Sequence, residues 1–238
     1  FINKSAGITR PADLAGRRVG IPVWDMAAAV WLRGMLEDYF DLPRSAPVYV
    51  TNGLEHARVG DEHPQFYPEG VVIEHATAEG GLARMLADGE IDALYTARAP
   101  SSYTADGPVS RLFEDPMPVE KGYFDKTGIY PAMHVVCIKR EIAEANPGLT
   151  ANLFEAFRTA QAVARARLYD SAALSVMLPW LLEHLTASEH MLGPDYWPCG
   201  LSKNAKMLET VIAYMQADGL ITSSFTPADL FDAAMAKT

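Results

Sequence analysis

Short strand-like segments alternate with helical segments in the first half of the chain. Four apolar runs predict strands, at residues 17–23, 47–51, 71–75 and 91–96. Helical spacing of apolar residues predicts one helix from Ala28 to Tyr39 and another over residues 81–88, which Gly89 ends. Strands that alternate with helices favour an α/β fold with a mainly parallel sheet. Such sheets bind their ligands beyond the carboxyl ends of the strands.

Length, charge and hydropathy limit the classes of protein to consider. The 238 residues, 49% of them apolar, suffice for one large domain or two small lobes. A net charge of −10 argues against nucleic acid as a partner, because phosphate backbones are bound by clustered Lys and Arg. No apolar run approaches the roughly 20 residues that span a bilayer. We therefore expect neither a nucleic acid nor a membrane as a partner.

Cysteine and histidine spacing gives no metal motif. Cys137 and Cys199 are far apart and form no CxxC pair, and His56, His63 and His75 are scattered through a polar region. We interpret these histidines as solvated surface residues. The expectation is a protein without a cofactor and without a recognisable metal ligand set, although His134 together with a residue outside this sequence would leave a metal site open.

The junction at Trp24–Ala28, between the first strand and its helix, is one candidate binding site. The first N–H groups of a helix have no partner inside it, and the helix dipole places partial positive charge there. Such a junction can receive a carboxylate or a phosphate. Most junctions of this kind in α/β proteins bind nothing, so this one needs support from other residues.

A second candidate is the loop Ala97–Ser102, which directly follows the last predicted strand. Arg98 can hold a carboxylate with two parallel N–H donors, and the hydroxyls of Ser101 and Ser102 can add hydrogen bonds. The alternative is an exposed loop arginine in a surface ion pair. We favour the binding role because a buried strand places Arg98 at the ligand-binding edge.

The middle of the chain contains one histidine of interest. Residues 109–127 read as irregular, with Pro116 and Pro118 as breakers, whereas residues 128–138 read as a buried strand that contains His134. A histidine in an apolar strand is usually a core residue. Its ordinary pKa near neutrality also makes His134 the first candidate for proton transfer.

The chain from Arg140 onward is predicted to be almost wholly helical. Its apolar stripes are expected to be core: residues 153, 157, 160 and 164; 174, 177, 178, 181 and 185; and 208, 211, 212 and 215. Thr226 and Pro227 mark a final helix start. The aromatic turn Gly193–Gly200 either lines a pocket or closes one end of the core. Since Phe1–Asn3 reads as the middle of a strand, we expect a segment before Phe1.

Four stretches together resemble the 4,5-dihydroxyphthalate decarboxylase family, which has the fold of type II periplasmic solute-binding proteins. They are RPADLAGRRVGIPVWDMAAAVWLRGML, LADGEIDALYTARAPSS, TGIYPAMHVVCIKRE and GPDYWPCGLSKNAKMLETVIAYMQADGLI. The first two are shared with many binding proteins and identify the fold. The MHVV and DYWPCG motifs point to the decarboxylase branch.

The resemblance implies two lobes with a ligand cleft between them. One α/β lobe would hold residues 9–128, and the other would combine residues 1–8 and 129–238 with an N-terminal part that this sequence lacks. Strands near residues 1–3 and 131–134 would cross between the lobes. The strand–helix junction, Arg98 and His134 would then face one cleft.

The implied activity is a carboxy-lyase reaction without a cofactor, which converts a 4,5-dihydroxyphthalate-like substrate into 3,4-dihydroxybenzoate and carbon dioxide. In this hypothesis His134 donates the proton, and Arg98 with Ser101 and Ser102 holds the retained carboxylate. Trp24 and Met26 belong to the substrate-binding junction, with Trp24 as an apolar wall. Asp25 either caps the helix or accepts a hydrogen bond from a phenolic hydroxyl.

A competing interpretation is a solute-binding protein that delivers an aromatic or other small carboxylate to an ABC-type transporter. It would use the same cleft without proton chemistry. The enzyme is expected in the cytoplasm, and the transport protein in the periplasm. In both cases the expected partner is a small aromatic carboxylate, and homo-oligomerisation is left open.

Overall fold

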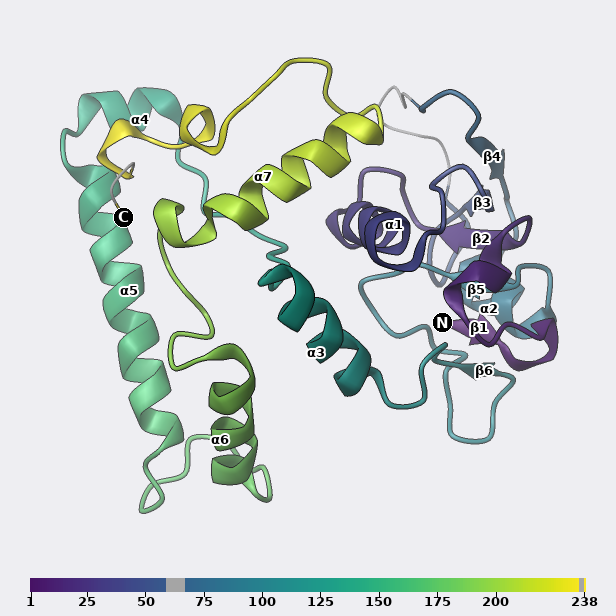
Figure 1. Cartoon of the computed structure of the whole chain (residues 1–238), viewed down its shortest axis with the longest axis horizontal. Coiled ribbons are helices and arrows are strands. Elements are labelled where there is room, and N and C mark those ends of the chain that lie inside the picture. Colours follow the sequence, from purple (N-terminus) through teal and green to yellow (C-terminus); the bar gives the residue numbers. More distant parts are fainter. Residues whose placement is uncertain (59–66, 236–237) are drawn as a thin grey trace. The chain divides into compact units, whose positions relative to one another are not determined.

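The chain is a mixed α/β protein (Figure 1), and its computed structural model describes residues 1–58, 67–235 and 238. The strands are β1 (Ile2–Asn3), β2 (Arg18–Ile21), β3 (Val48–Thr51), β4 (Val72–His75), β5 (Ala93–Leu94) and β6 (Val109–Ser110). The helices are α1 (Ala27–Phe40), α2 (Gly81–Asp88), α3 (Pro116–Thr127), α4 (Arg140–Ala145), α5 (Leu149–Leu168), α6 (Leu181–Leu192) and α7 (Leu201–Ala217). Short 3₁₀ helices cover Lys4–Ala6, Pro11–Leu14, Pro227–Leu230 and Ala233–Met235.

The chain divides into two compact units. The first unit comprises Phe1–Lys126 and Thr210–Ser223, and the second comprises Thr127–Glu209 and Ser224–Thr238. None of the described helices combines the length and the hydropathy that crossing a bilayer requires.

The sheet of the first unit has the strand order β4-β3-β2-β5-β1-β6. Strands β2, β3, β4 and β5 run parallel, whereas β1 pairs antiparallel with both β5 and β6. The four strands and two helices predicted from alternating patterns are thus confirmed, and so is a strand at Ile2–Asn3. The parallel arrangement places the carboxyl ends of β2 to β5 at one edge of the sheet.

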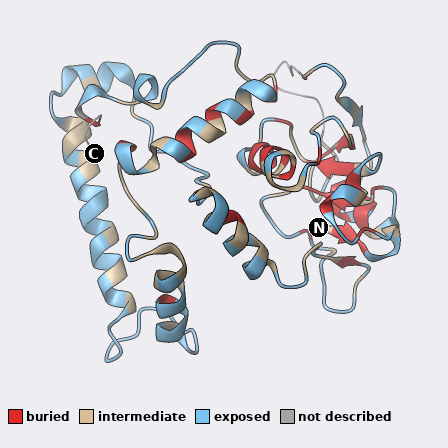
Figure 2. Cartoon of the chain, in the orientation of Figure 1, coloured by how far each residue is buried: buried red, intermediate tan, exposed pale blue. Residues whose placement is uncertain are grey.

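Helices α1 and α2 cover opposite faces of this sheet. Val19 and Ile21 of β2 belong to the same buried cluster as Leu36 of α1, whereas Val50 of β3 packs in a second cluster with Leu82 of α2. Alternate residues of a strand point to opposite faces, which explains how neighbouring positions join different clusters. In Figure 2 the buried residues concentrate in these strands and in α1.

The last part of α7 completes the first unit. Tyr214 meets the ring of Trp31 at a centroid distance of 5.7 Å, and its hydroxyl donates to Asp38 Oδ2 at 2.7 Å. Gly34 allows this close packing, since a Cβ atom there would lie 2.2 Å from the Tyr214 ring. Ile212 in this part of α7 and Leu208 in the part that belongs to the second unit are both buried, as predicted for the third apolar stripe.

The prediction of irregular structure up to residue 127 was wrong, because Pro116–Thr127 forms α3. Pro116 is the first helical residue and Pro118 also lies in the first turn. Backbone N–H groups in that turn have no partner inside a helix, so proline costs nothing there. Both prolines are compatible with a helix start.

The predicted buried strand at residues 128–138 was also wrong. These residues have no regular secondary structure, and Val135 and Val136 are 62% and 66% exposed. A strand needs a neighbour to satisfy its backbone groups, and the second unit contains no strand among its described residues. Apolar composition alone therefore did not produce a strand.

Two of the three helical stripes predicted to be core are largely exposed. Phe157 on α5 is 52% exposed, and Leu174 and Met177, which precede α6, are 65% and 97% exposed. Figure 2 shows α5 as exposed over most of its length. An amphipathic helix buries its apolar face only where another layer packs on it. The final helix start at Thr226 is present, but it leads only into the 3₁₀ helix Pro227–Leu230.

Candidate functional site

The carboxyl ends of β2 and β5 form the candidate site of the first unit. These parallel strands are neighbours, and β5 continues beside β2 through a hydrogen bond from Tyr95 N to Gly20 O at 2.8 Å. The chain leaves β2 through α1 on one face and reaches β5 from α2 on the other. Connections that diverge in this way mark the position where open α/β sheets bind ligands.

The junction between β2 and α1 lies at this position. Met26 is the N-cap residue of α1, and no side-chain hydrogen bond caps the helix. Of the two roles considered for Asp25, the N-cap role was wrong, since the extended backbone that starts the helix is at Met26 and the exposed Asp25 is one residue too early. The first turn of α1 keeps its preference for an anion.

The N-terminus of α2, by contrast, is already occupied. Leu82 N donates to Gly53 O at 2.9 Å, and Ala83 N donates to Leu54 O at 2.8 Å. The loop after β3 thus satisfies two of the N–H groups that a helix start leaves free. Of these two helix starts, α1 is the better candidate for an anion site.

Trp24 supports the junction from within the core. It is 1% exposed, and its indole N–H donates to Asp218 O at 2.9 Å. The guanidinium of Arg33 lies 3.7 Å from the ring centroid, and the rings of Tyr49 and Tyr67 meet it edge-on. The structure therefore encloses this ring among protein groups, and the predicted role of Trp24 as an apolar wall that contacts the substrate was wrong.

Arg98 lies beyond the carboxyl end of β5, as expected. Its side chain is exposed, and its backbone N–H donates to Thr96 Oγ1 at 3.3 Å. Among the residues that the structure describes, no ion pair of its guanidinium is found. An exposed guanidinium at this edge is able to bind a carboxylate with two parallel hydrogen bonds.

Ser101 holds a carboxylate that the sequence interpretation missed. Its backbone N–H donates to Glu55 Oε1 at 2.9 Å, and its hydroxyl donates to Glu55 Oε2 at 2.5 Å. Glu55 lies in the loop after β3 and is half-buried. Arg98 was predicted because ligands bind beyond the carboxyl ends of parallel strands, and the same rule applies to the end of β3. The position of Glu55 after β3 was therefore a signal from which this residue could have been predicted.

Two further hydroxyl groups near this edge are buried. Ser102 Oγ and Tyr95 Oη have no hydrogen-bond partner among the described residues. Burial raises the pKa of Tyr95 well above its ordinary value, so its hydroxyl stays protonated and remains a donor. Buried hydroxyls normally have partners, and those of Ser102 and Tyr95 are donors available to a ligand or a water molecule.

His134 belongs to the second unit, whereas the other predicted site residues belong to the first. The structure therefore brings Trp24, Asp25, Met26, Arg98, Ser101 and Ser102 into one unit and leaves the position of His134 relative to them undescribed. His134 itself is exposed in the irregular segment before α4, so the interpretation as a core histidine was wrong. An exposed imidazole remains able to transfer protons.

The aromatic turn Gly193–Gly200 is anchored to α5 rather than closing the core. Gln161 donates to Trp197 O at 2.7 Å, and the guanidinium of Arg165 lies 4.5 Å from the centroid of the Tyr196 ring. Trp197 is 62% exposed, and its ring centroid is 5.6 Å from that of Tyr130. Trp197 is an accessible aromatic side chain whose backbone carbonyl is hydrogen-bonded to α5.

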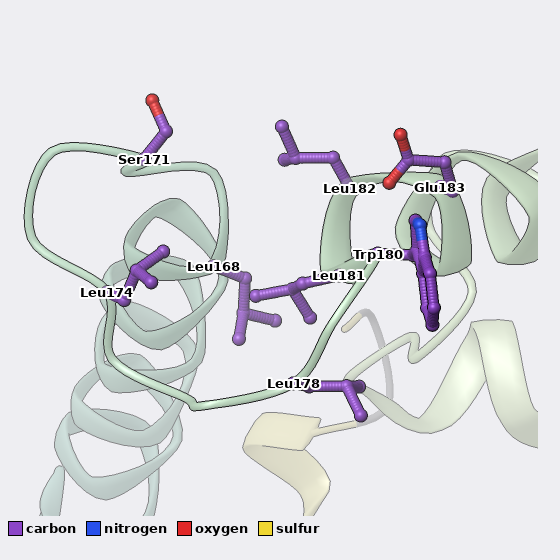
Figure 3. Close-up of a pocket in the computed structure, with 8 residues that line it drawn as sticks. All are labelled: Leu168, Ser171, Leu174, Leu178, Trp180, Leu181, Leu182 and Glu183. Carbon is purple, nitrogen blue, oxygen red and sulfur yellow. The ribbon is translucent and has the colours of Figure 1, made fainter.

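A hollow in the second unit lies between the end of α5 and the start of α6 (Figure 3). Its volume is about 280 Å³. The lining residues are Leu168, Ser171, Leu174, Leu178, Trp180, Leu181, Leu182 and Glu183. Since its lining is mostly leucine and contains no cationic side chain, this hollow does not suit a dicarboxylate.

Candidate metal ligands do not gather in the described part of the chain, where no group of three or more His, Cys, Asp or Glu side chains could hold an ion. His56 and His75 are exposed, as predicted, and the Nδ1 atom of His75 lies 2.7 Å from Thr51 Oγ1. His63 lies outside the described residues.

Proteins of known activity are similar to the chain. A 4,5-dihydroxyphthalate decarboxylase of Comamonas testosteroni is 34% identical over 98% of the chain and 71% of its own length. A 4,5-dihydroxyphthalate decarboxylase of Pseudomonas putida is 38% identical over 49% of the chain and 45% of its own length. A 2'-hydroxybiphenyl-2-sulfinate desulfinase of Rhodococcus erythropolis is 33% identical over 40% of the chain and 33% of its own length. No family model matches the chain.

Proposed function

The chain belongs to the 4,5-dihydroxyphthalate decarboxylase family, and from this premise we propose that it is a carboxy-lyase acting on a hydroxylated aromatic dicarboxylate. The substrate is 4,5-dihydroxyphthalate or a close analogue, and the products are carbon dioxide and 3,4-dihydroxybenzoate. The observation that carries this proposal is the 34% identity to the Comamonas decarboxylase over 98% of the chain.

The finer fold assignment is part of the same proposal. We infer the two-lobed fold of type II periplasmic binding proteins, with one lobe near residues 9–128 and the other formed by residues 1–8 and 129–238. The four parallel strands β2 to β5, with helices on both faces, support the first lobe. The fold alone does not define the reaction, which rests on the relatives and on the site chemistry.

The reaction replaces a carboxylate on an aromatic ring with a hydrogen atom. A proton adds to the ring carbon that bears the carboxylate, and the carbon–carbon bond then breaks so that its electron pair returns to the ring. Each hydroxyl of 4,5-dihydroxyphthalate is para to one carboxylate and can stabilise the dearomatised intermediate. The name of the Rhodococcus relative describes a parallel change, the loss of a sulfinate group from a hydroxylated biphenyl. Both reactions need a proton donor at the ring and a group that holds the anion.

Five of the seven predicted site residues have a role in this scheme, whereas both donors of Ser101 bind Glu55 and not the substrate carboxylate. Arg98 binds the retained carboxylate, with help from the buried hydroxyl of Ser102 and the first turn of α1 after Met26. His134 donates the proton to the ring. Trp24 supports the β2–α1 junction from the core, since its ring is enclosed by protein groups.

The test is to incubate the purified chain with 4,5-dihydroxyphthalate and to follow carbon dioxide and 3,4-dihydroxybenzoate together. In D₂O the product should carry one deuterium at the vacated ring position. Phthalate, which has no hydroxyl groups, is the matched control and should release no carbon dioxide. Binding of 4,5-dihydroxyphthalate without carbon dioxide release would overturn the proposal and favour a solute-binding protein of a transporter.

A further inference from the structure

The carboxylate of Glu55 is fixed by two donors of one residue. The N–H and the hydroxyl of Ser101 each donate to a different oxygen of Glu55, at 2.9 and 2.5 Å. Each carboxylate oxygen can accept a second hydrogen bond. The half-buried Glu55 therefore presents an oriented acceptor to any ligand that reaches this edge.

The Glu55–Ser101 contact lies across the carboxyl end of β2. In the sheet, β2 is flanked by β3 and β5, and the contact joins the loop after β3 to the loop after β5. It therefore passes the end of β2 at the position where the β2–α1 junction begins. A hydrogen bond from Arg58 Nη1 to Pro22 O at 3.4 Å also connects the β3 loop to this junction.

The charges at this edge match the two ends of the proposed substrate. The loop after β5, whose Ser101 binds the anionic Glu55, also contains the cationic Arg98, three positions before Ser101 in the sequence. A 4,5-dihydroxyphthalate ring has two carboxylates on one edge and two hydroxyl donors on the opposite edge. Glu55 repels the carboxylate edge and attracts the hydroxyl edge. The ring is therefore favoured in one orientation.

We propose that Glu55 accepts a hydrogen bond from a ring hydroxyl of the substrate and thereby selects hydroxylated phthalates over phthalate. This assignment rests on the proposed decarboxylase function. Ser101 is the positioning residue, because both of its donors orient Glu55. The assignment replaces Asp25 as the acceptor, because the two donors of Ser101 fix the carboxylate of Glu55.

Glu55 also takes part in the proton balance of the reaction. When the proton donor protonates the ring carbon, the para hydroxyl passes its proton to Glu55, and the ring becomes a neutral dienone that still bears the carboxylate. Carbon dioxide then leaves, the bonding electron pair returns to the ring, and the oxygen recovers its proton from Glu55. The net change is one proton gained by carbon and one molecule of carbon dioxide released.

The test compares the affinities of 4,5-dihydroxyphthalate and phthalate on wild type and variants, measured by stopped-flow mixing in the time before turnover. Wild type should bind the hydroxylated ligand at least about tenfold more tightly, as expected for a hydrogen bond to a charged acceptor. Glu55→Gln should remove most of this preference by weakening only the hydroxylated ligand. It should also lower kcat at least about 100-fold. The matched control is Glu74→Gln, which changes an exposed carboxylate on β4 that pairs with Arg18. This variant should keep both affinities.

A second variant separates positioning from folding. Ser101→Ala removes the hydroxyl donor to Glu55 Oε2 but keeps the backbone N–H donor to Oε1, so it should reduce the preference partly while the melting temperature stays within a few degrees. The proposal is overturned if Glu55→Gln keeps the preference, if it weakens both ligands equally, or if Asp25→Asn removes the preference instead. If wild type turns over the substrate but Glu55→Gln is unchanged, only this assignment fails. If wild type releases no carbon dioxide, the proposed function fails, and the affinity ratio still tests the ligand contact.

Discussion

Arg33 and Asp218 are 185 residues apart in the sequence, and they form a salt bridge in which both side chains are fully buried. Arg33 Nε and Nη2 both donate to Asp218 Oδ2, at 3.0 and 2.5 Å, while Arg44 Nη1 donates to Asp218 Oδ1 at 2.7 Å. Arg33 also donates to the backbone carbonyl of Trp24 at 2.7 Å. The carboxylate of Asp218 thus joins the segment after α7 to α1 and to the loop after α1, and Arg33 connects this pair to the junction at the candidate site.

Replacing Asp218 with Ala should destabilise the first unit by about 3–5 kcal/mol, because it leaves the buried guanidinium of Arg33 without its anion. The free energy of unfolding, measured by urea denaturation, tests this. Asp88→Ala is the matched control, since its pair with Arg84 is exposed and should contribute at most about 1 kcal/mol. Equal losses for the two variants would show that the buried pair has no special weight.

Gly34→Ala should destabilise the packing of α7 on α1 by about 1–3 kcal/mol, despite the higher helix propensity of alanine. The new Cβ would lie 2.2 Å from the ring of Tyr214, which is 5% exposed and bonded to Asp38. Thermal unfolding of the single variant and of Gly34→Ala with Tyr214→Ala tests the cause. The double variant should lose less than the sum of the two single losses, and simple additivity would contradict the clash.

Arg98→Ala should weaken the binding of 4,5-dihydroxyphthalate about 10- to 100-fold, because a bidentate charged hydrogen bond is lost. Arg98→Lys should recover only part of the affinity, since an ammonium group cannot reproduce the planar fork. Stopped-flow binding before turnover measures both affinities. The exposed Arg84 on α2 provides the control variant Arg84→Ala, whose affinity should equal that of wild type. An unchanged affinity for Arg98→Ala would remove Arg98 from the site.

His134→Gln should lower kcat by about 100- to 10,000-fold while the affinity for 4,5-dihydroxyphthalate stays within about threefold of wild type. The variant loses the proton donor, whereas the groups that bind the carboxylates are unchanged. Single-turnover release of carbon dioxide measures the effect. The control is His190→Gln on α6, in the same unit. Full activity in His134→Gln would exclude this histidine from proton transfer.

The carboxyl group of Asp13 should titrate with a pKa of about 2, because Thr9 stabilises its charged form through backbone and hydroxyl hydrogen bonds. A folded-state pKa below the unfolded value stabilises the fold above the unfolded pKa, and this contribution is lost as the pH falls toward about 2. Carboxyl ¹³C NMR measures the titration. Thr9→Val should raise the pKa of Asp13 and leave unchanged that of Asp229, which Thr226 lowers in the same way.

Sequence patterns correctly predicted the secondary-structure elements that residues close in sequence specify. Apolar periodicity was sufficient to predict β2, α1 and α2, and Gly89 was sufficient to predict the end of α2. Helical spacing and a left-handed C-terminal glycine depend only on residues close in sequence. The error at α3 was also local, since Pro116 was read as a breaker although it stands at the first helical position. The error at residues 128–138 was different in kind. A strand requires a partner that its own residues do not encode.

The amino-acid sequence alone was enough to predict a parallel α/β sheet, a binding edge at its carboxyl ends, the place of Arg98 on that edge, and the resemblance to the decarboxylase family. It did not show that Glu55 lies against Ser101, 46 positions later, or that Arg33 and Asp218 enclose Trp24 from opposite ends of the chain. Those relationships depend on which loops and helices meet after the strands have paired. Hydrogen-bond partners and burial are properties of the assembled layers, whereas periodicity and capping signals are properties of neighbouring residues.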